Sequence, residues 1–228
     1  MTQNRQLTWE GCVNVRDLGG LSARDGRKTR WGAVVRSDTP SRLTAAGWAA
    51  LHAHGIRTII SLRTAGKPED VPDTAPRPPD LTTQLVEIED FADTEFVKQW
   101  AATDLWGTPL YYRDALKRWP ERHAAAIRAV ALARPGGVLI HCMGGIDRTG
   151  IITLLLLALA GVAPADIAAD YELGLDAYRV ELLAREHTSP HEVILATLAG
   201  LDAEAYLLAG GLSQADLAAV RTRLLEGA

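Results

Sequence analysis

The stretch "LIHCMGGIDRTGI", residues 139–151, joins two apolar segments through a pair of glycines. The segment before Cys142 is short and apolar, which is typical of a buried strand. The run from Gly150 to Val162 has the composition of a helix that is buried on all sides. The chain must turn sharply between them, and Gly144 and Gly145 permit this because glycine tolerates positive φ. The stretch therefore predicts a strand, a tight loop and a helix that begins near Arg148.

Such a loop has the features of an anion-binding site. Successive backbone N–H groups can converge on one point, and the N-terminus of the following helix adds its positive dipole there. These surroundings also stabilise a thiolate, which makes Cys142 a candidate nucleophile. Arg148 can donate two hydrogen bonds to one phosphate, which lysine cannot do. The phosphate site is expected to comprise Met143, Gly144, Gly145, Ile146, Asp147 and Arg148.

Two neighbours of this loop are expected to support it. Thr149 can donate its hydroxyl to the sulfur of Cys142, and His141 can orient the loop through backbone hydrogen bonds without acting as a base. A Gly-rich turn with a purely structural role would need neither the cysteine nor an arginine at this offset. The nucleotide-binding pattern G-x-x-x-x-G-K-[ST] and the redox pattern Cys-x-x-Cys are both absent.

Composition restricts the classes of function. The chain has 228 residues and a net charge of −4, without the basic footprint of a nucleic-acid-binding protein. Its two cysteines cannot form a disulfide framework or a structural zinc site, and Cys12 is interpreted as a small buried hydrophobe. No metal or other cofactor is expected. The polar N-terminus does not resemble a signal peptide and no apolar run is long enough to span a membrane, so a cytoplasmic protein is expected.

The remaining sequence predicts an α/β fold with a central, mainly parallel sheet flanked by helices. A single domain is expected over residues 1–228, with three or four extra C-terminal helices in 163–228 packed on the core. Residues 64–80 are rich in proline and aspartate and predict a loop. The aromatic residues in 91–120 indicate helices packed on the core. The alternative is a helical cover, in which residues 91–112 would close over the active site. Candidate strands lie at 31–38, 57–63, 81–90 and 138–142, and candidate helices at 43–55, 122–137 and about 148–160.

Residues 141–149 fit the pattern H-C-x-x-G-x-x-R-[ST], the signature of cysteine-based protein tyrosine phosphatases. More narrowly, the chain resembles bacterial tyrosine/lipid phosphatases whose loop reads H-C-x-x-G-K-D-R-T-G. The segments "NVRDLGG" (14–20), "VVRSD" (34–38), "DYELG" (170–174) and the helix at 210–225 are similar to segments of that family. The resemblance covers nearly the whole chain.

The resemblance implies a protein-tyrosine-phosphatase-like fold and a two-step phosphoryl transfer without a metal. Cys142 would attack phosphorus and form a cysteinyl-phosphate, which water then hydrolyses. Arg148 and the backbone amides of 143–148 would stabilise the transition state. The protein would be a protein tyrosine phosphatase that acts on phosphotyrosine-like monoesters, in a phosphorylated protein or a small molecule; phosphoinositide hydrolysis and an inactive phosphate-binding module are the alternatives. The oligomeric state is left open.

The chain departs from the family pattern at two positions. Ile146 stands where the family has lysine, which removes a positive charge from the expected rim of the loop and weakens the phosphoinositide alternative. Ser61 stands where the family has the aspartate of D-L-R, which motivates the binding-module alternative.

The leaving oxygen of an alkyl phosphate needs a proton. Asp147 is the candidate general acid, with a purely structural hydrogen bond as the other interpretation of this residue. The reserve candidates are Asp90, Asp93 and Asp104. Arg16 and Asp17 are expected to form a structural pair near the loop.

Overall fold

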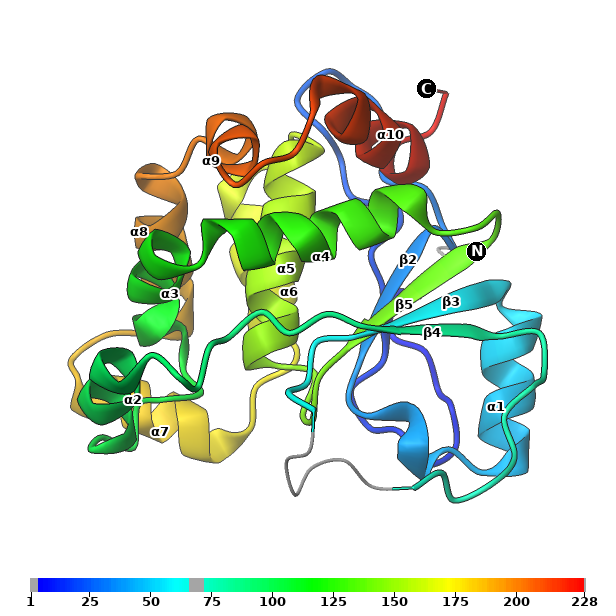
Figure 1. The fold of residues 1–228 in the computed structure, drawn as a ribbon, viewed down its shortest axis with the longest axis horizontal. Helices are drawn as coiled ribbons and strands as arrows, with labels where there is room; N and C mark the ends of the chain where they lie inside the picture. The colour runs from blue at the N-terminus through cyan, green and yellow to red at the C-terminus, as the bar shows by residue number, and fades with distance from the viewer. Residues whose placement is uncertain (1–3, 66–71, 228) are drawn as a thin grey trace.

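The computed structural model describes residues 4–65 and 72–227 (Figure 1). Its centre is a five-stranded sheet in the order β1-β2-β5-β3-β4. The pairings of β2 with β5, β5 with β3 and β3 with β4 are parallel, and only β1 is antiparallel to its neighbour. The predicted α/β fold with a mainly parallel sheet is therefore confirmed. The strands are β1 (Arg16–Asp17), β2 (Val34–Ser37), β3 (Ile56–Ser61), β4 (Thr82–Leu85) and β5 (Gly137–His141).

Helices cover the sheet, and several further helices lie beside it on one side (Figure 1). The described residues form α1 (Ala45–Ala53), α2 (Thr94–Ala101), α3 (Tyr112–Arg118), α4 (Pro120–Leu132), α5 (Asp147–Leu159), α6 (Pro164–Glu172), α7 (Ala177–Arg185), α8 (Pro190–Ala199), α9 (Ala203–Ala209) and α10 (Gln214–Leu224). Short 3-10 helices lie at Pro40–Arg42 and Pro109–Tyr111. None of the helices in the described part of the chain is long and apolar enough to cross a membrane.

The central strands are buried on both faces. Along β5, Val138 and Ile140 belong to the hydrophobic cluster under α4 and α5, whereas Leu139 belongs to a second cluster with Trp48 and Leu51 of α1. Successive side chains of a strand point to opposite faces, so a strand covered on both sides must be apolar throughout. This explains the apolar residues Val138, Leu139 and Ile140, which precede His141 in β5.

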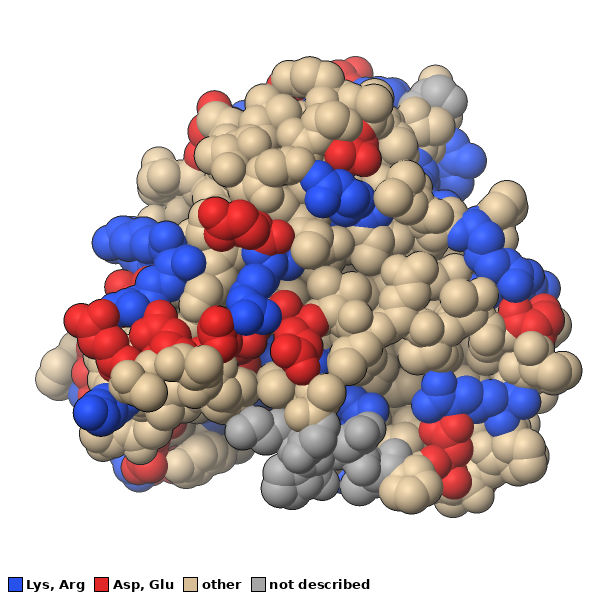
Figure 2. Space-filling view, in the orientation of Figure 1, with Lys and Arg blue, Asp and Glu red and all other residues tan. Residues whose placement is uncertain are grey.

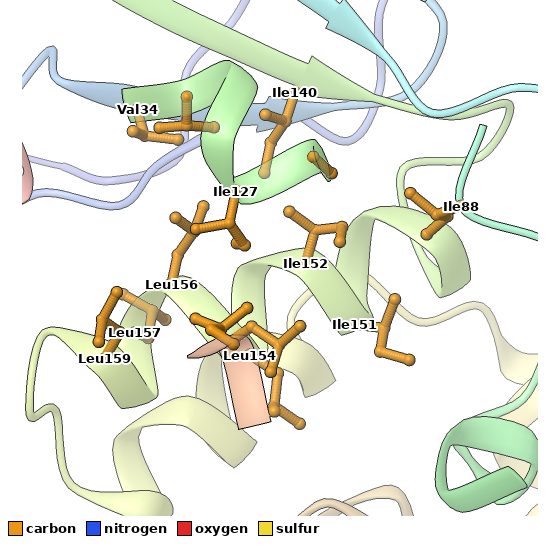
Figure 3. Packing of buried hydrophobic residues seen from close by; sticks show 14 of the residues in the cluster. Val34, Ile88, Ile127, Ile140, Ile151, Ile152, Leu154, Leu156, Leu157 and Leu159 are labelled. Atoms are coloured by element: carbon orange, nitrogen blue, oxygen red, sulfur yellow. The ribbon is translucent and has the colours of Figure 1, made fainter. Parts of the chain in front are cut away.

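Helix α5 is the central helix of the larger cluster. Figure 3 shows Ile152 and Leu156 of α5 on the side of Ile127 and the sheet, and Ile151 and Leu154 on the opposite side of the helix. Every α5 residue from Thr149 to Leu157 is buried, as predicted for this run. Gly150 allows the close approach of Tyr112, because a Cβ atom there would lie 2.4 Å from the tyrosine Oη. The helix that follows the loop is thus fixed by packing along its whole length.

The region 163–228 contains five helices in the described residues, more than the three or four expected. The short helix α9 lies between two strongly capped neighbours, since both α8 and α10 begin with a capping box. α9 and α10 both pack against α4. Part of the predicted loop 64–80, residues 66–71, lies outside the described residues.

Candidate active site

The loop at 142–146 lies at the carboxyl edge of the parallel strands, where open α/β sheets bind their ligands. It leaves β5 at His141 and enters α5 at Asp147. The Thr39 N–H after β2 donates to the carbonyl of Met143 at 3.0 Å, and the Leu62 N–H after β3 donates to the carbonyl of His141 at 2.8 Å. The segments on both sides of β5 therefore hold the start of the loop.

Gly145 is the glycine that the turn requires. Its φ is +67°, and a Cβ atom there would lie 2.4 Å from the carbonyl carbon and oxygen of Ser37. Gly144 is exposed and has only ordinary contacts around its Cβ position. The sequence suggested both glycines for the turn, but only Gly145 combines positive φ with close backbone packing.

A network of polar side chains, which includes the buried Arg36 and Asp170, holds the backbone of the loop. The Asn14 side-chain amide donates to the carbonyl of Gly144 at 2.9 Å, and Arg36 Nη2 donates to the carbonyl of Gly145 at 2.8 Å. Arg36 also forms an ion pair of 2.8 Å with Asp170 of α6, which accepts a further bond from Arg5. Burial by itself would raise the pKa of Asp170, but the charges of Arg36, Arg16 and Arg5 outweigh it and hold the pKa below its usual value.

Arg16 and Asp17 do not form the expected pair. Arg16 bonds to Asn14 and to the backbone carbonyl of Asp170. Asp17 instead accepts from the ring of His54 at 2.7 Å and from two backbone amides. The two residues are neighbours in β1, where consecutive side chains point to opposite faces. Both remain structural, in separate networks.

Cys142 follows β5 directly and its exposed fraction is 3%. His141 beside it donates from Nδ1 to the carbonyl of Cys142 at 3.0 Å, and burial lowers the pKa of the imidazole to about 3, so the ring is neutral. The hydroxyl of Thr149 is buried and has no hydrogen-bond partner among the described residues. The expected bond from Thr149 to the sulfur is therefore absent from this structure.

Asp147 is the first residue of α5 and its side chain is 16% exposed. Its Oδ2 accepts from Nη2 of Arg179 at 3.0 Å, whereas its buried Oδ1 has no hydrogen-bond partner among the described residues. Burial raises the pKa of this carboxyl to about 6, although Arg179 opposes the shift. The Tyr112 hydroxyl donates to the backbone carbonyl of Asp147 at 2.7 Å and fixes the start of the helix.

Arg148 is largely buried, with 13% of its side chain exposed. Its Nε lies 3.8 Å from Oε2 of Glu89, a carboxylate that is 5% exposed and follows β4 in the chain. A carboxylate at this distance restrains the orientation of the guanidinium group. Glu89 and Arg179 are two residues of the site that the sequence did not identify, because neither lies in the signature or beside it.

A pocket of about 190 Å³ opens at the start of α5, directly after the loop. Phe91 and Trp106 stack at its edge with ring centroids 5.4 Å apart. Elsewhere in the 91–120 segment, Phe96 is fully buried and packs on Trp119 with a centroid separation of 4.4 Å. One part of this segment thus belongs to the core and another part to the pocket. The pocket is lined by Glu89, Phe91, Trp106, Gly107, Tyr111, Asp147 and Arg148.

Two of the three reserve acids, Asp90 and Asp93, have arginine partners. Arg122 forms an ion pair with Asp90 at 2.8 Å, and Arg118 forms one with Asp93 at 2.8 Å. A backbone amide bond and the arginine lower the pKa of Asp90, and the backbone N–H of Phe96 lowers the pKa of Asp93 at the start of α2. Figure 2 shows acidic and basic side chains gathered together around α2 and α3. Carboxylates held in this way are poor proton donors, which leaves Asp147 better placed.

The two departures from the family pattern are both buried. Ile146 is 7% exposed and belongs to the larger hydrophobic cluster, so its side chain does not lie at an exposed rim as expected. Ser61 is 4% exposed and its hydroxyl accepts from Nε of Arg63 at 3.3 Å. The expectation that this position lies at the charged rim of the loop is therefore wrong. A lysine in place of Ile146 could not keep its ammonium group in this buried site and would have to point elsewhere.

Cys12 is only partly buried, and its sulfhydryl donates to the carbonyl of Thr39 at 3.5 Å. Burial and the nearby Asp38 raise the pKa of this thiol, which keeps it protonated. Within residues 4–65 and 72–227, no group of three or more histidine, cysteine, aspartate or glutamate side chains is arranged to hold a metal ion.

Comparison with known proteins relates this geometry to one family. The model of the tyrosine phosphatase family matches residues 7–226. A predicted tyrosine-protein phosphatase of Cupriavidus necator is 32% identical over an alignment of 170 residues, with 72% of this chain and 61% of the relative covered. A tyrosine-protein phosphatase of Nostoc commune is 32% identical over an alignment of 145 residues, with 62% of this chain and 48% of the relative covered.

The triple specificity protein phosphatase PtpB of Mycobacterium tuberculosis is 29% identical over 194 residues, with 71% of this chain and 66% of that protein covered. The chain therefore spans about half to two thirds of the length of these relatives. The family match, in contrast, extends over almost all of the present sequence. The chain belongs to the tyrosine phosphatase family.

Proposed function

We propose that this protein is a metal-independent phosphomonoesterase that works through a cysteinyl-phosphate, with phosphotyrosine-like esters as its main substrates. The observation that carries the proposal is the placement of Cys142 and Arg148 at the two ends of one tight loop between β5 and the N-terminus of α5. A phosphate in that loop would meet backbone N–H groups, a helix dipole and a guanidinium group at once.

In the first step the sulfur of Cys142 attacks phosphorus, and the bond between phosphorus and the ester oxygen breaks. The leaving oxygen takes the proton of Asp147 and departs as an alcohol or phenol. In the second step water attacks phosphorus, the phosphorus–sulfur bond breaks, and Asp147 takes a proton from the water. The products are inorganic phosphate and the free thiolate. Arg148 and the loop amides carry the negative charge of the transferring group in both steps.

Two features support Asp147 as the proton donor. Burial keeps the pKa of its carboxyl at about 6, so a large fraction is protonated in mildly acidic solution. Its Oδ1 is buried without a hydrogen-bond partner among the described residues, so no donor stabilises the ionised form at that oxygen. The carboxylates of Asp90 and Asp93 lack both features, because backbone N–H donors and then arginines hold them in the ionised form.

The pocket supports an aromatic substrate. Phe91, Trp106 and Tyr111 present rings beside Asp147 and Arg148, and ring-to-ring packing favours a phenyl phosphate over a phosphorylated hydroxyalkyl side chain. The buried Ile146 does not line this pocket, so it gives no argument for or against phosphoinositides, which stay the alternative substrate class. The mycobacterial relative is named a triple specificity phosphatase, so a test of specificity needs several substrate classes.

A substrate panel tests the proposal. Phosphotyrosine peptides, phosphoserine peptides and phosphoinositide vesicles are assayed for phosphate release, with Cys142→Ser as the control. The proposal predicts the highest kcat/KM for phosphotyrosine. A chain that binds phosphate or vanadate but releases no phosphate from any substrate would instead be a phosphate-binding module.

A further inference from the structure

Arg179 makes three polar contacts from one guanidinium group. It lies in the first turn of α7, and its Nη2 donates to Oδ2 of Asp147 at 3.0 Å. Its Nε donates to the backbone carbonyl of Gly107 at 2.7 Å, and its Nη1 pairs with Asp176 at 2.5 Å. Because a guanidinium group is planar, these three bonds fix its orientation. Arg179 thus joins α7, the start of α5 and the turn at 106–107.

The bond from Arg179 makes the two carboxyl oxygens of Asp147 chemically different. Oδ2 accepts from a permanently charged donor and is a poor place for a proton. Oδ1 is buried and has no hydrogen-bond partner among the described residues. A proton on this carboxyl group is therefore placed on Oδ1. Asp147 lines the pocket beside Arg148 with the part of its side chain that is exposed, 16% of the total.

The bond to Gly107 connects the acid to the pocket wall. Gly107 has φ of +97°, and a Cβ atom there would lie 3.6 Å from both Nη2 of Arg179 and Oδ2 of Asp147. The preceding residue, Trp106, is the ring that stacks on Phe91 at the edge of the pocket. The wall and the acid are therefore held by the same side chain.

We infer that Arg179 is a positioning residue: through Oδ2 it holds the carboxyl group of Asp147 at the pocket beside Arg148, and it fixes the Trp106–Gly107 turn against the same carboxyl group. The inference rests on the proposed role of Asp147 as the acid.

The charged surroundings of Asp147 give this role a measurable signature. The groups that face it are Arg179 from α7, Glu89 after β4, Arg148 from α5, and the phenols of Tyr111, Tyr112 and Tyr171. Burial keeps the pKa of all three phenols well above the usual value, so they stay neutral. Arg179 is the cation hydrogen-bonded to the carboxyl group, and its removal favours the protonated acid.

The test measures kcat/KM against pH for an alkyl and an aryl phosphate in four proteins: wild type, Arg179→Met, Arg179→Lys and Arg185→Met. Arg185 is the matched control, since it lies on the same helix and pairs with Glu181 at an exposed position. In Arg179→Met the alkaline limb of the alkyl phosphate profile should move up by roughly one pH unit. The rate near pH 6 should fall roughly tenfold because the carboxyl group of Asp147 is no longer held in position. Arg179→Lys keeps the positive charge, so the pH of its alkaline limb should be close to that of wild type, whereas its rate near pH 6 should recover less. Arg185→Met should match wild type in both.

Two outcomes would overturn the inference while the proposed function stands. In one, Asp147→Asn slows alkyl phosphates but Arg179→Met leaves the alkaline limb in place. In the other, Arg179→Met slows the Asp147→Asn enzyme as much as it slows wild type, although a residue that acts through Asp147 should add less than about twofold there. If Asp147→Asn slows neither substrate, the acid role itself fails and the inference fails with it. Absence of all turnover in wild type would reject the proposed function.

Discussion

Nη1 of Arg36 lies 2.8 Å from Oδ2 of Asp170, and both side chains are only 1% exposed. Arg36 is in β2, which pairs directly with β5, the strand that leads to the loop. Asp170 is in α6, the helix that follows α5. Because Nη2 of Arg36 also donates to the carbonyl of Gly145, the ion pair fixes the loop from two distant segments of the chain. The segments "VVRSD" and "DYELG", which resemble family segments, meet at this contact.

Asp170→Asn should destabilise the protein strongly, because it leaves the buried guanidinium groups of Arg36 and Arg16 without a compensating charge. Breaking a buried pair in this way costs about 3–5 kcal/mol of the free energy of unfolding. Denaturant unfolding measures the loss. Asp166→Asn, at an exposed position of the same helix, is the control and should change the free energy by less than about 0.5 kcal/mol. Equal stability of the two variants would show that the network does not hold the loop.

Gly145→Ala and Gly144→Ala form a matched pair in the loop. Gly145 has positive φ and abuts the backbone of Ser37, so alanine there should lower the free energy of unfolding by more than about 2 kcal/mol and reduce turnover sharply. Gly144 has room for a methyl group, and its alanine variant should remain folded and close to wild type in stability. Thermal unfolding and p-nitrophenyl phosphate turnover of both variants test this difference. The prediction is wrong if the two substitutions have the same effect.

Asp147→Asn should affect catalysis according to the leaving group. An alkoxide leaving group needs the proton of Asp147 far more than a nitrophenolate does. We expect kcat/KM to fall roughly 100-fold or more for alkyl phosphates and much less for p-nitrophenyl phosphate. In wild type, the pKa of about 6 means that alkyl phosphate turnover should decline as the pH rises above 6. If turnover of Asp147→Asn declines above pH 6 in the same way, the decline is caused by the titration of another group.

The same substitution should stabilise the fold at neutral and alkaline pH. Burial raises the pKa of Asp147 from its ordinary value of 3.8 to about 6 in the folded state. The carboxyl therefore favours folding below pH 4, and this contribution is lost as the pH rises through 6, because the unfolded chain releases the proton more easily. The shift corresponds to at most about 3 kcal/mol. Thermal unfolding of Asp147→Asn should show a Tm gain over wild type at pH 8 that is absent at pH 4; a loss of Tm at both values would contradict this linkage.

Features that are local in the chain could be predicted from the sequence. The order of strand, loop and helix around Cys142 follows from apolar runs and glycines within a few residues, and the structure has that order. The burial of α5 followed from a composition without a polar face. The parallel sheet followed from the alternation of strands and helices along the chain.

Contacts between distant segments could not be predicted in this way. Arg179 reaches Asp147 across 32 positions, and Glu89 approaches Arg148 from a different strand, so no spacing in the sequence connects them. The orientation of Ile146 depends on how α5 packs, which a loop pattern does not contain. The separation of Arg16 from Asp17 is different, since the alternation of side chains along a strand would have predicted it.

The most direct test of the central claim is turnover of p-nitrophenyl phosphate by the wild-type protein and by Cys142→Ser, with vanadate binding measured in parallel. The account predicts turnover by wild type and at least a roughly 1000-fold loss in Cys142→Ser, because the loop keeps its phosphate contacts but loses its nucleophile. Cys12→Ser, which changes the other cysteine, should behave as wild type. Turnover by Cys142→Ser at the wild-type rate would contradict the account.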